Sequence, residues 1–307
     1  MTWQSYYYSN ALKNFAENKN NILTDRKFYT KFNALVRDYE TSVHYHYALE
    51  DFCDIYSQTL VFGLLLARLD TDTKFDEQHL NYLDNIPAEY ELMHEFLSGA
   101  YSNRYLPPYI KIALVNVGKY LNLIDINAIQ KEFNSNDNGR QNIAVYLYEE
   151  FLKEFDKLCS KDNRKKNGVY YTPKEAVDFI TKSVNEVIKT NFEKKEGYCS
   201  QDVKVLDFAC GTGTFIRSVL EQMLPEKMDD LTKKTLKDKI LKDIYGFELL
   251  YTPYVIAHTV LTQMLRDKGI VFDSGRGERL TILLTNTLDI SQHSISDYMP
   301  EMQYEYE

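Results

Sequence analysis

Apolar residues recur at three- and four-residue steps through much of the first half of the chain. The clearest run spans residues 47–70, where one helical face would carry Leu49, Phe52, Cys53, Tyr56, Leu60, Leu64 and Ala67. Residues 88–97 (AEYELMHEFL) and 143–158 (IAVYLYEEFLKEFDKL) repeat this helical pattern, and residues 134–140 (NSNDNGR) have the composition of a loop. No strand alternation stands out before residue 160. We therefore expect an all-helical domain over residues 1–160.

The pattern changes after a polar, basic stretch, KDNRKKNG at 161–168, which we interpret as a solvated linker rather than a DNA contact. Short apolar runs at 203–209 (VKVLDFA), 243–249 (DIYGFEL) and 280–286 (LTILLTN) predict strands, the first of them buried. Helical patterns occupy 172–189, 214–224 and 252–265. Thr172 is the expected N-cap of the first of these helices, and Thr252 that of the third. Alternating helices and strands predict an α/β domain with a parallel sheet over residues 161–307.

Composition narrows the function classes. The net charge is −9 and neither half of the chain is basic, so bulk charge indicates no nucleic-acid footprint. We find no apolar run of about 18 residues and no secretory signal, so we expect no membrane partner. The four cysteines form no C-x-x-C pair, which argues against zinc or a disulfide framework and suits a reducing cytoplasm. His44 and His46 are expected to be surface histidines, and no metal is expected.

Polar side chains follow each predicted strand. Asp207 comes after the first strand, Glu248 after the second and Asn286 after the third. Ligands of parallel α/β sheets bind beyond the carboxyl ends of the strands. Gly211 and Gly213 would let the backbone approach such a ligand closely before the next helix begins.

A dinucleotide and a nucleoside triphosphate fit this pattern poorly. The G-x-G-x-x-G fingerprint fails because Ile216 occupies the third glycine position, and no G-K-[ST] follows for a phosphate loop. S-adenosylmethionine fits better, because it carries an ammonium group, a ribose diol and an adenine but no phosphate. A carboxylate can accept hydrogen bonds from both ribose hydroxyls, and a side-chain amide can meet the adenine edge.

Four segments, in order, resemble the motifs of N6-adenine DNA methyltransferases. DFACGTGTF (207–215) resembles motif I, and GVYYTPKEAVDFI (168–180) is similar to the motif that precedes it. GFELLYTPYVIAH (246–258) is similar to the second motif and LLTNTLD (283–289) to the third. The resemblance covers most of residues 45–290. It is greatest to the coupler and methyltransferase region of type ISP restriction–modification enzymes, which implies a Rossmann-like, S-adenosylmethionine-dependent methyltransferase sheet after the helical domain.

The resemblance also implies a role for individual residues. Thr172 would contact the methionine carboxylate, the segment from Asp207 to Gly213 would line the methionine end, Glu248 would bind the ribose hydroxyls, and Asn286 would meet the adenine amino group. The full set of expected cofactor-binding residues is Tyr171, Thr172, Asp207, Ala209, Cys210, Gly211, Thr212, Gly213, Thr214, Phe215, Glu248 and Asn286. Cys210 is expected to be a small buried residue rather than a reactive thiol.

The family's catalytic motif, Asn/Asp-Pro-Pro-Tyr/Phe, does not follow Asn286 in this sequence. The Pro-Pro-Tyr in YLPPYIK (105–111) has Leu106 where the hydrogen-bond acceptor should be, so we interpret it as the start of a helix. We therefore expect no catalytic residue in this chain. The later strands and the DNA target-recognition domain would lie in a C-terminal remainder, and the first strand, central in the family, would have one edge unpaired.

Two functions stay open at this point. The chain is expected to be the S-adenosylmethionine-binding half of a DNA adenine-N6 methyltransferase, inactive by itself and contacting double-stranded DNA mostly through parts outside it. The alternative is a non-catalytic coupling module with a vestigial cofactor site.

Overall fold

The computed structural model describes residues 2–17, 26–43, 49–71, 74–75, 107–135, 143–159, 172–273 and 276–287. The chain divides into two compact units, Met1–Thr41 with Tyr45–Val169 and Ser42–His44 with Tyr170–Glu307. The linker expected at 161–168 and the helix expected at 88–97 lie outside the described residues. Each unit is described separately below.

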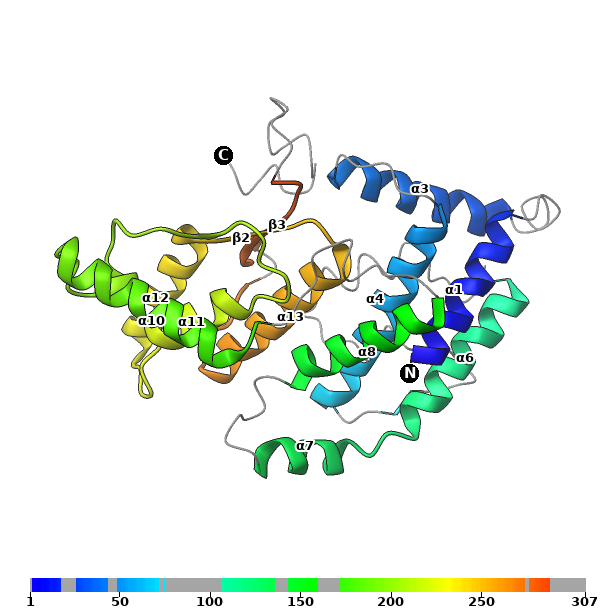
Figure 1. Ribbon diagram of the computed structural model, residues 1–307, viewed down its shortest axis with the longest axis horizontal. Helices are drawn as coiled ribbons and strands as arrows, with labels where there is room; N and C mark the ends of the chain where they lie inside the picture. The colour runs from blue at the N-terminus through cyan, green and yellow to red at the C-terminus, as the bar shows by residue number, and fades with distance from the viewer. Residues whose placement is uncertain are drawn as a thin grey trace. The chain divides into compact units, whose positions relative to one another are not determined.

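The described part of the first unit is helical, as the apolar periodicity predicts (Figure 1). Its helices are α1 (Thr2–Glu17), α3 (Arg26–Val43), α4 (Leu49–Thr71), α6 (Pro108–Asn122), α7 (Ile126–Ser135) and α8 (Ile143–Cys159). Helix α1 packs on α4, α6 and α8. The core is strongly aromatic: Phe32 of α3 packs against Phe52 and Tyr56 of α4, with ring centroids 5.5 and 6.2 Å away.

Helix α4 is long and apolar enough, by length and composition, to cross a membrane, which the sequence analysis did not anticipate. However, 89% of its most apolar stretch is buried inside the structure. Within the unit its buried Asp54 accepts hydrogen bonds from Ser9 and Lys13 of α1, at 2.5 and 2.7 Å. These properties are those of a core helix.

The Pro-Pro-Tyr segment begins a helix, as expected. Pro107 is the N-cap of α6 and Pro108 its first residue. Proline suits this position because the first helical N–H groups have no partner within the helix. The segment is therefore the start of a helix in the first unit.

The second unit contains a three-stranded parallel sheet in the order β1-β2-β3. Its elements are α10 (Lys174–Asn191), the short 3₁₀ helix η3 (Gly197–Cys199), β1 (Val205–Asp207), α11 (Thr214–Met223), α12 (Asp230–Asp243), β2 (Ile244–Glu248), α13 (Tyr251–Asp267) and β3 (Thr281–Leu284). Helices α12 and α13 pack on β2, and α13 also packs on β3. All three strands predicted from the sequence are present.

Two details of the predicted sheet and helices need correction. Strand β1 is not fully buried, since Leu206 is 52% exposed, and among the described residues β1 pairs only with β2. Helix α12 was not predicted, because its sequence is largely charged and only Leu236 and Ile240 are buried. Its start is fixed instead by Asp229, whose side chain accepts a hydrogen bond from the Thr232 N–H at 2.8 Å.

The predictions that Thr172 and Thr252 are helix N-caps are also wrong. Helix α10 begins at Lys174 with Pro173 as its N-cap, because the Pro173 carbonyl accepts the N–H groups of Ala176 and Val177. Helix α13 begins at Tyr251, one residue before Thr252, with Leu250 as its N-cap. In both helices the proline lies within two residues of the start, where its missing N–H costs nothing.

Candidate functional site

The candidate site lies where β1 and β2 end. Parallel pairing sets Asp207 of β1 opposite Gly246 of β2, so that Glu248 lies just beyond the end of β1. The loop from Phe208 to Gly213 then runs across the end of β2, because the Cys210 N–H donates to the Phe247 carbonyl at 2.9 Å. The sheet therefore brings the first acid, the glycine loop and the second acid together.

Glu248 is the best-anchored side chain of the site. It is buried, and its Oε2 accepts a hydrogen bond from the Gly211 N–H at 2.8 Å while Oε1 accepts one from the Leu250 N–H at 2.7 Å. Each carboxylate oxygen has two lone pairs, so each can accept one further hydrogen bond. Burial raises the pKa of Glu248, the backbone hydrogen bonds lower it, and the charge of Asp207 raises it again.

Asp207 has one oxygen without a partner. Oδ1 accepts a long hydrogen bond from the Ala209 N–H at 3.3 Å, whereas Oδ2 is buried and has no hydrogen-bond partner among the described residues. Burial raises the pKa of this carboxyl group. An unsatisfied buried carboxylate oxygen is costly, and it is the arrangement expected where a ligand supplies the missing donor or a positive charge.

The two glycines of the loop differ in their surroundings. Both have positive φ, +55° at Gly211 and +81° at Gly213. A Cβ at Gly213 would lie 2.9 Å from Leu261 Cδ1, so this glycine allows the loop to pack on α13. Within the described residues, no heavy atom lies within 4 Å of a Cβ built at Gly211. Gly211 therefore borders open space, and Gly213 supports the fold.

Asn286 lies beside these groups. The N–H of Thr285 donates to the Glu248 carbonyl at 2.8 Å, and Thr287 Oγ1 donates to the Phe208 carbonyl at 3.1 Å. Asn286, between these two anchored residues, is half-buried. The threonines were not among the predicted site residues. Their only sequence signal was their place on either side of the predicted asparagine.

The other predicted residues lie within the loop, at the start of α11 or ahead of α10. Ala209 is exposed, Thr212 is half-buried, and Thr214 and Phe215 are the first two residues of α11 and half-buried. Cys210 is buried, and its thiol has a pKa raised first by burial and then by Glu248 and Asp207, so it is the inert small residue expected. Thr172 is half-buried ahead of α10, and Tyr171 lies outside the described residues.

A family model matches the part of the chain that carries this site. The family model for N-6 DNA Methylase matches residues 140–294, which is half of the chain and includes the whole candidate site. The chain belongs to this N-6 DNA methylase family. No curated protein matches the chain.

Three solved structures share the fold across nearly the whole chain. The first is a nuclease-deletion mutant of the type ISP restriction–modification enzyme LlaGI in complex with a DNA substrate mimic, at 21% identity, TM-score 0.57 and 97% coverage of this chain. The DrdV–DNA complex matches at 19% identity, TM-score 0.62 and 97% coverage. The ATP-dependent type ISP enzyme LlaBIII bound to DNA matches at 23% identity, TM-score 0.56 and 96% coverage. This chain spans 22%, 27% and 19% of their respective lengths.

Proposed function

We propose that this chain is the S-adenosylmethionine-binding part of a DNA adenine-N6 methyltransferase of a restriction–modification system. The observation that carries the proposal is the convergence of Glu248, the glycine loop and the unsatisfied Oδ2 of Asp207 at the ends of β1 and β2. Membership of the N-6 DNA methylase family and the fold shared with type ISP enzymes support it. In this proposal the sheet is part of a Rossmann-like methyltransferase domain.

The chemistry of the side chains fits the cofactor. Each carboxylate oxygen of Glu248 can accept one further hydrogen bond, and the two ribose hydroxyls donate these bonds. Asp207 favours the positively charged ammonium group of the amino-acid end, whose N–H groups satisfy Oδ2, while the open space at Gly211 leaves room for the ligand. Thr172 meets the methionine carboxylate and Asn286 the adenine edge. Tyr171, Ala209, Cys210, Thr212, Gly213, Thr214 and Phe215 complete the lining.

S-adenosylmethionine, when bound, supplies a methyl group activated by a sulfonium. What this chain's residues contribute is binding and orientation of the cofactor. The sequence has no Asn/Asp-Pro-Pro-Tyr/Phe motif to accept hydrogen bonds from the adenine amino group and no basic region suited to duplex DNA. We therefore assign those two tasks to a further part of the enzyme; the DNA-bound structures that share the fold are of chains several times longer than this one.

The proposal is tested by transfer of tritiated methyl groups from S-adenosylmethionine to mixed-sequence plasmid DNA. Residues 1–307 alone should give no incorporation, because positioning of both reactants accounts for much of the rate. Addition of a chain that carries the missing motif and the rest of the sheet should restore it, with N6-methyladenine as the product. Incorporation by residues 1–307 alone would contradict the division of tasks, and any product other than N6-methyladenine would contradict the assigned reaction.

A further inference from the structure

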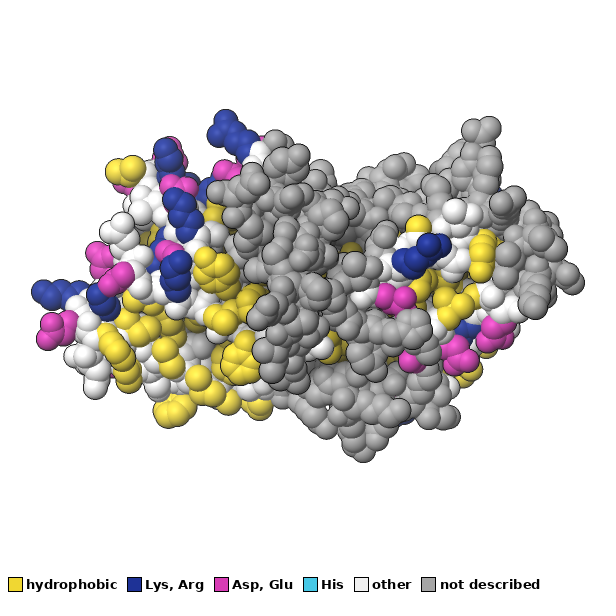
Figure 2. All heavy atoms as spheres, turned by 90° about the horizontal axis from the view of Figure 1, so that it is seen from above, with side chains coloured by type: hydrophobic (Ala, Val, Ile, Leu, Met, Phe, Trp, Pro, Cys, Tyr) yellow, Lys and Arg dark blue, Asp and Glu magenta, His cyan; other side chains and the backbone are white. Residues whose placement is uncertain are grey.

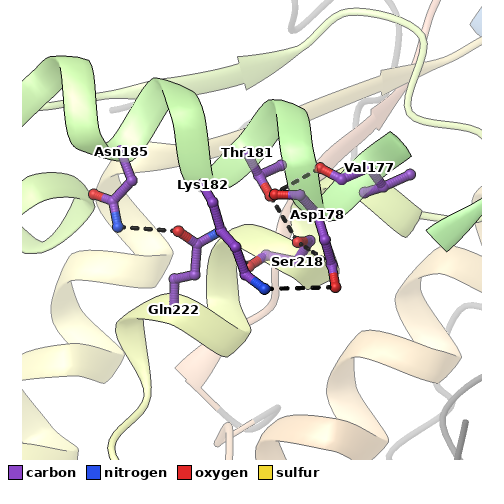
Figure 3. Close-up of polar contacts among 7 residues, drawn as sticks. All are labelled: Val177, Asp178, Thr181, Lys182, Asn185, Ser218 and Gln222. Atoms are coloured by element: carbon purple, nitrogen blue, oxygen red, sulfur yellow. Dashed lines mark hydrogen bonds and ion pairs between the residues drawn. The ribbon is translucent and has the colours of Figure 1, made fainter. Parts of the chain in front are cut away.

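Polar side chains join helices α10 and α11 (Figure 3). The Ser218 hydroxyl of α11 donates to Asp178 Oδ1 at 3.0 Å and lies 2.8 Å from the Thr181 hydroxyl, and Asn185 donates to Gln222 Oε1 at 3.0 Å. We call these five residues the polar seam. Asp178 also pairs with the exposed Lys182 at 3.8 Å.

The polar seam fixes the relative direction of the two helices and the position of one along the axis of the other. Asp178 contacts Ser218 and, further along, Asn185 contacts Gln222, so the helices run parallel. Asp178 follows the first residue of α10, Lys174, by four positions, and Ser218 follows the first residue of α11, Thr214, by four. The amino-terminal ends of α10 and α11 are therefore level with each other.

Several apolar residues of α10 are turned outward. Its buried residues are Val177, Thr181 and Asn185. In contrast, Phe179 is 73% exposed, and Ile180, Val184 and Val187 are each 45% exposed. Hydrophobic side chains gather on the surface of this unit in Figure 2. Hydrogen bonds are directional, whereas apolar contacts tolerate sliding, so the seam specifies one register of α10 on α11.

The loop at η3 closes the seam at its carboxyl end. The Tyr198 N–H donates to Asn185 Oδ1 at 3.1 Å, and the Tyr198 hydroxyl donates to the Thr181 carbonyl at 2.7 Å. A Cβ at Gly197 would lie only 1.9 Å from Asn185 Oδ1, so glycine alone allows this approach. Because both ends of the Asn185 amide are engaged, rotation of α10 about its axis is restricted.

The proposed site for the methionine part of the cofactor is built at these two amino-terminal helix ends. Thr172 immediately precedes the Pro173 cap of α10, and Gly213 is the N-cap of α11. We propose that Thr181, Asn185 and Ser218 are positioning residues that hold Thr172 level with the Gly211–Gly213 loop, and so set the affinity for the amino-acid part of the cofactor. This inference rests on the proposed function.

The test compares two ligands on the whole chain by calorimetry: S-adenosylmethionine, and 5′-methylthioadenosine, which has the adenine and ribose but lacks the amino and carboxylate groups. Thr181→Val removes the Thr181 hydroxyl at nearly constant side-chain volume, whereas Thr181→Ser keeps a hydroxyl at this position. Ser218→Ala removes the partner hydroxyl. Thr190→Ala on the same helix is the control, because the hydrogen bonds of Thr190 to described residues are to Glu186 and Asn191, at the exposed end of α10.

Thr181→Val and Ser218→Ala should lower the affinity for S-adenosylmethionine by about tenfold and leave the affinity for methylthioadenosine nearly unchanged. Thr181→Ser and Thr190→Ala should behave as wild type. Partial unfolding lowers both affinities by the same factor. The ratio of the affinity for S-adenosylmethionine to that for methylthioadenosine therefore separates an effect on positioning from a simple loss of stability. An unchanged ratio in Thr181→Val and Ser218→Ala would overturn the inference while leaving the proposed function standing. Failure of the wild type to bind either ligand would contradict both this inference and the proposed function.

Discussion

The carboxylate of Glu248 accepts a hydrogen bond from the backbone N–H of Gly211 at 2.8 Å. One residue ends β2 and the other lies in the loop after β1, so a single contact joins the two parts of the candidate site. A ligand that donates a hydrogen bond to Glu248 therefore also meets the loop in one fixed conformation. We expect cofactor affinity to depend on this pair more than on any exposed acid nearby.

Replacement of Glu248 tests its ribose role. Glu248→Ala should weaken S-adenosylmethionine binding by about 2–3 kcal/mol, because hydrogen bonds to a charged acceptor are lost. Glu248→Gln keeps one acceptor oxygen and should lose less. Equilibrium dialysis with labelled cofactor measures both, and Glu226→Ala, which removes an exposed glutamate, is the control. Wild-type affinity in Glu248→Ala would disprove the role.

The two loop glycines should respond differently to alanine. Gly211→Ala should cost about 1 kcal/mol of unfolding free energy, from its positive φ alone. Gly213→Ala should cost about 2–4 kcal/mol, because its Cβ would also meet Leu261 Cδ1 at 2.9 Å and Ala257 Cβ at 3.3 Å. Urea denaturation gives both values. Equal losses would show that the packing of Gly213 on α13 is not what requires glycine.

Gly211→Ala should nevertheless impair cofactor binding, since its methyl group would project into the open space that Gly211 borders, where we place the ligand. The folded variant is expected to bind S-adenosylmethionine at least about tenfold more weakly, a loss that its small change in stability does not explain. Calorimetry on the folded variant measures this. Unchanged affinity would place the cofactor away from Gly211.

His258 should make folding sensitive to acid. Its Nε2 lies 3.0 Å from the Ile282 carbonyl oxygen, and burial, then the charge of Arg279, lower its pKa from 6.5 to about 3. Between pH 6.5 and about 3 the histidine is therefore protonated in the unfolded chain but neutral in the folded chain. The free energy of unfolding falls as the pH drops through this range. His258→Gln should show a smaller loss over that range in denaturant titrations at several pH values. Parallel curves for the two proteins would contradict this, since the other titrating groups are common to both.

The strands and the acids at their ends could be predicted from the sequence because the signal is local. Each strand is a short apolar run that ends at a polar residue, and parallel pairing then brings Asp207, Glu248 and the residues around Asn286 to one edge of the sheet. The Pro-Pro-Tyr segment was also a local signal, since proline at Pro108 suits only the first turn of a helix.

The parts that could not be predicted depend on contacts distant in sequence. The rule that apolar residues face inward would bury Phe179 and Val184, yet α10 buries Thr181 and Asn185 because Ser218 and Gln222 provide their partners. The start of α13 was misplaced for a related reason. The carboxylate of Glu248 accepts the Leu250 N–H, and the helix begins immediately after that residue.

The most direct test of the account is a calorimetric titration of S-adenosylmethionine into residues 1–307 and into the Asp207→Asn variant. Asparagine keeps the shape of the side chain but removes the charge that would face the amino-acid end of the cofactor. We predict saturable binding at one site per chain in the wild type, and an affinity at least about tenfold lower in the variant. No saturable binding by the wild type, or equal affinity in the two proteins, would contradict it.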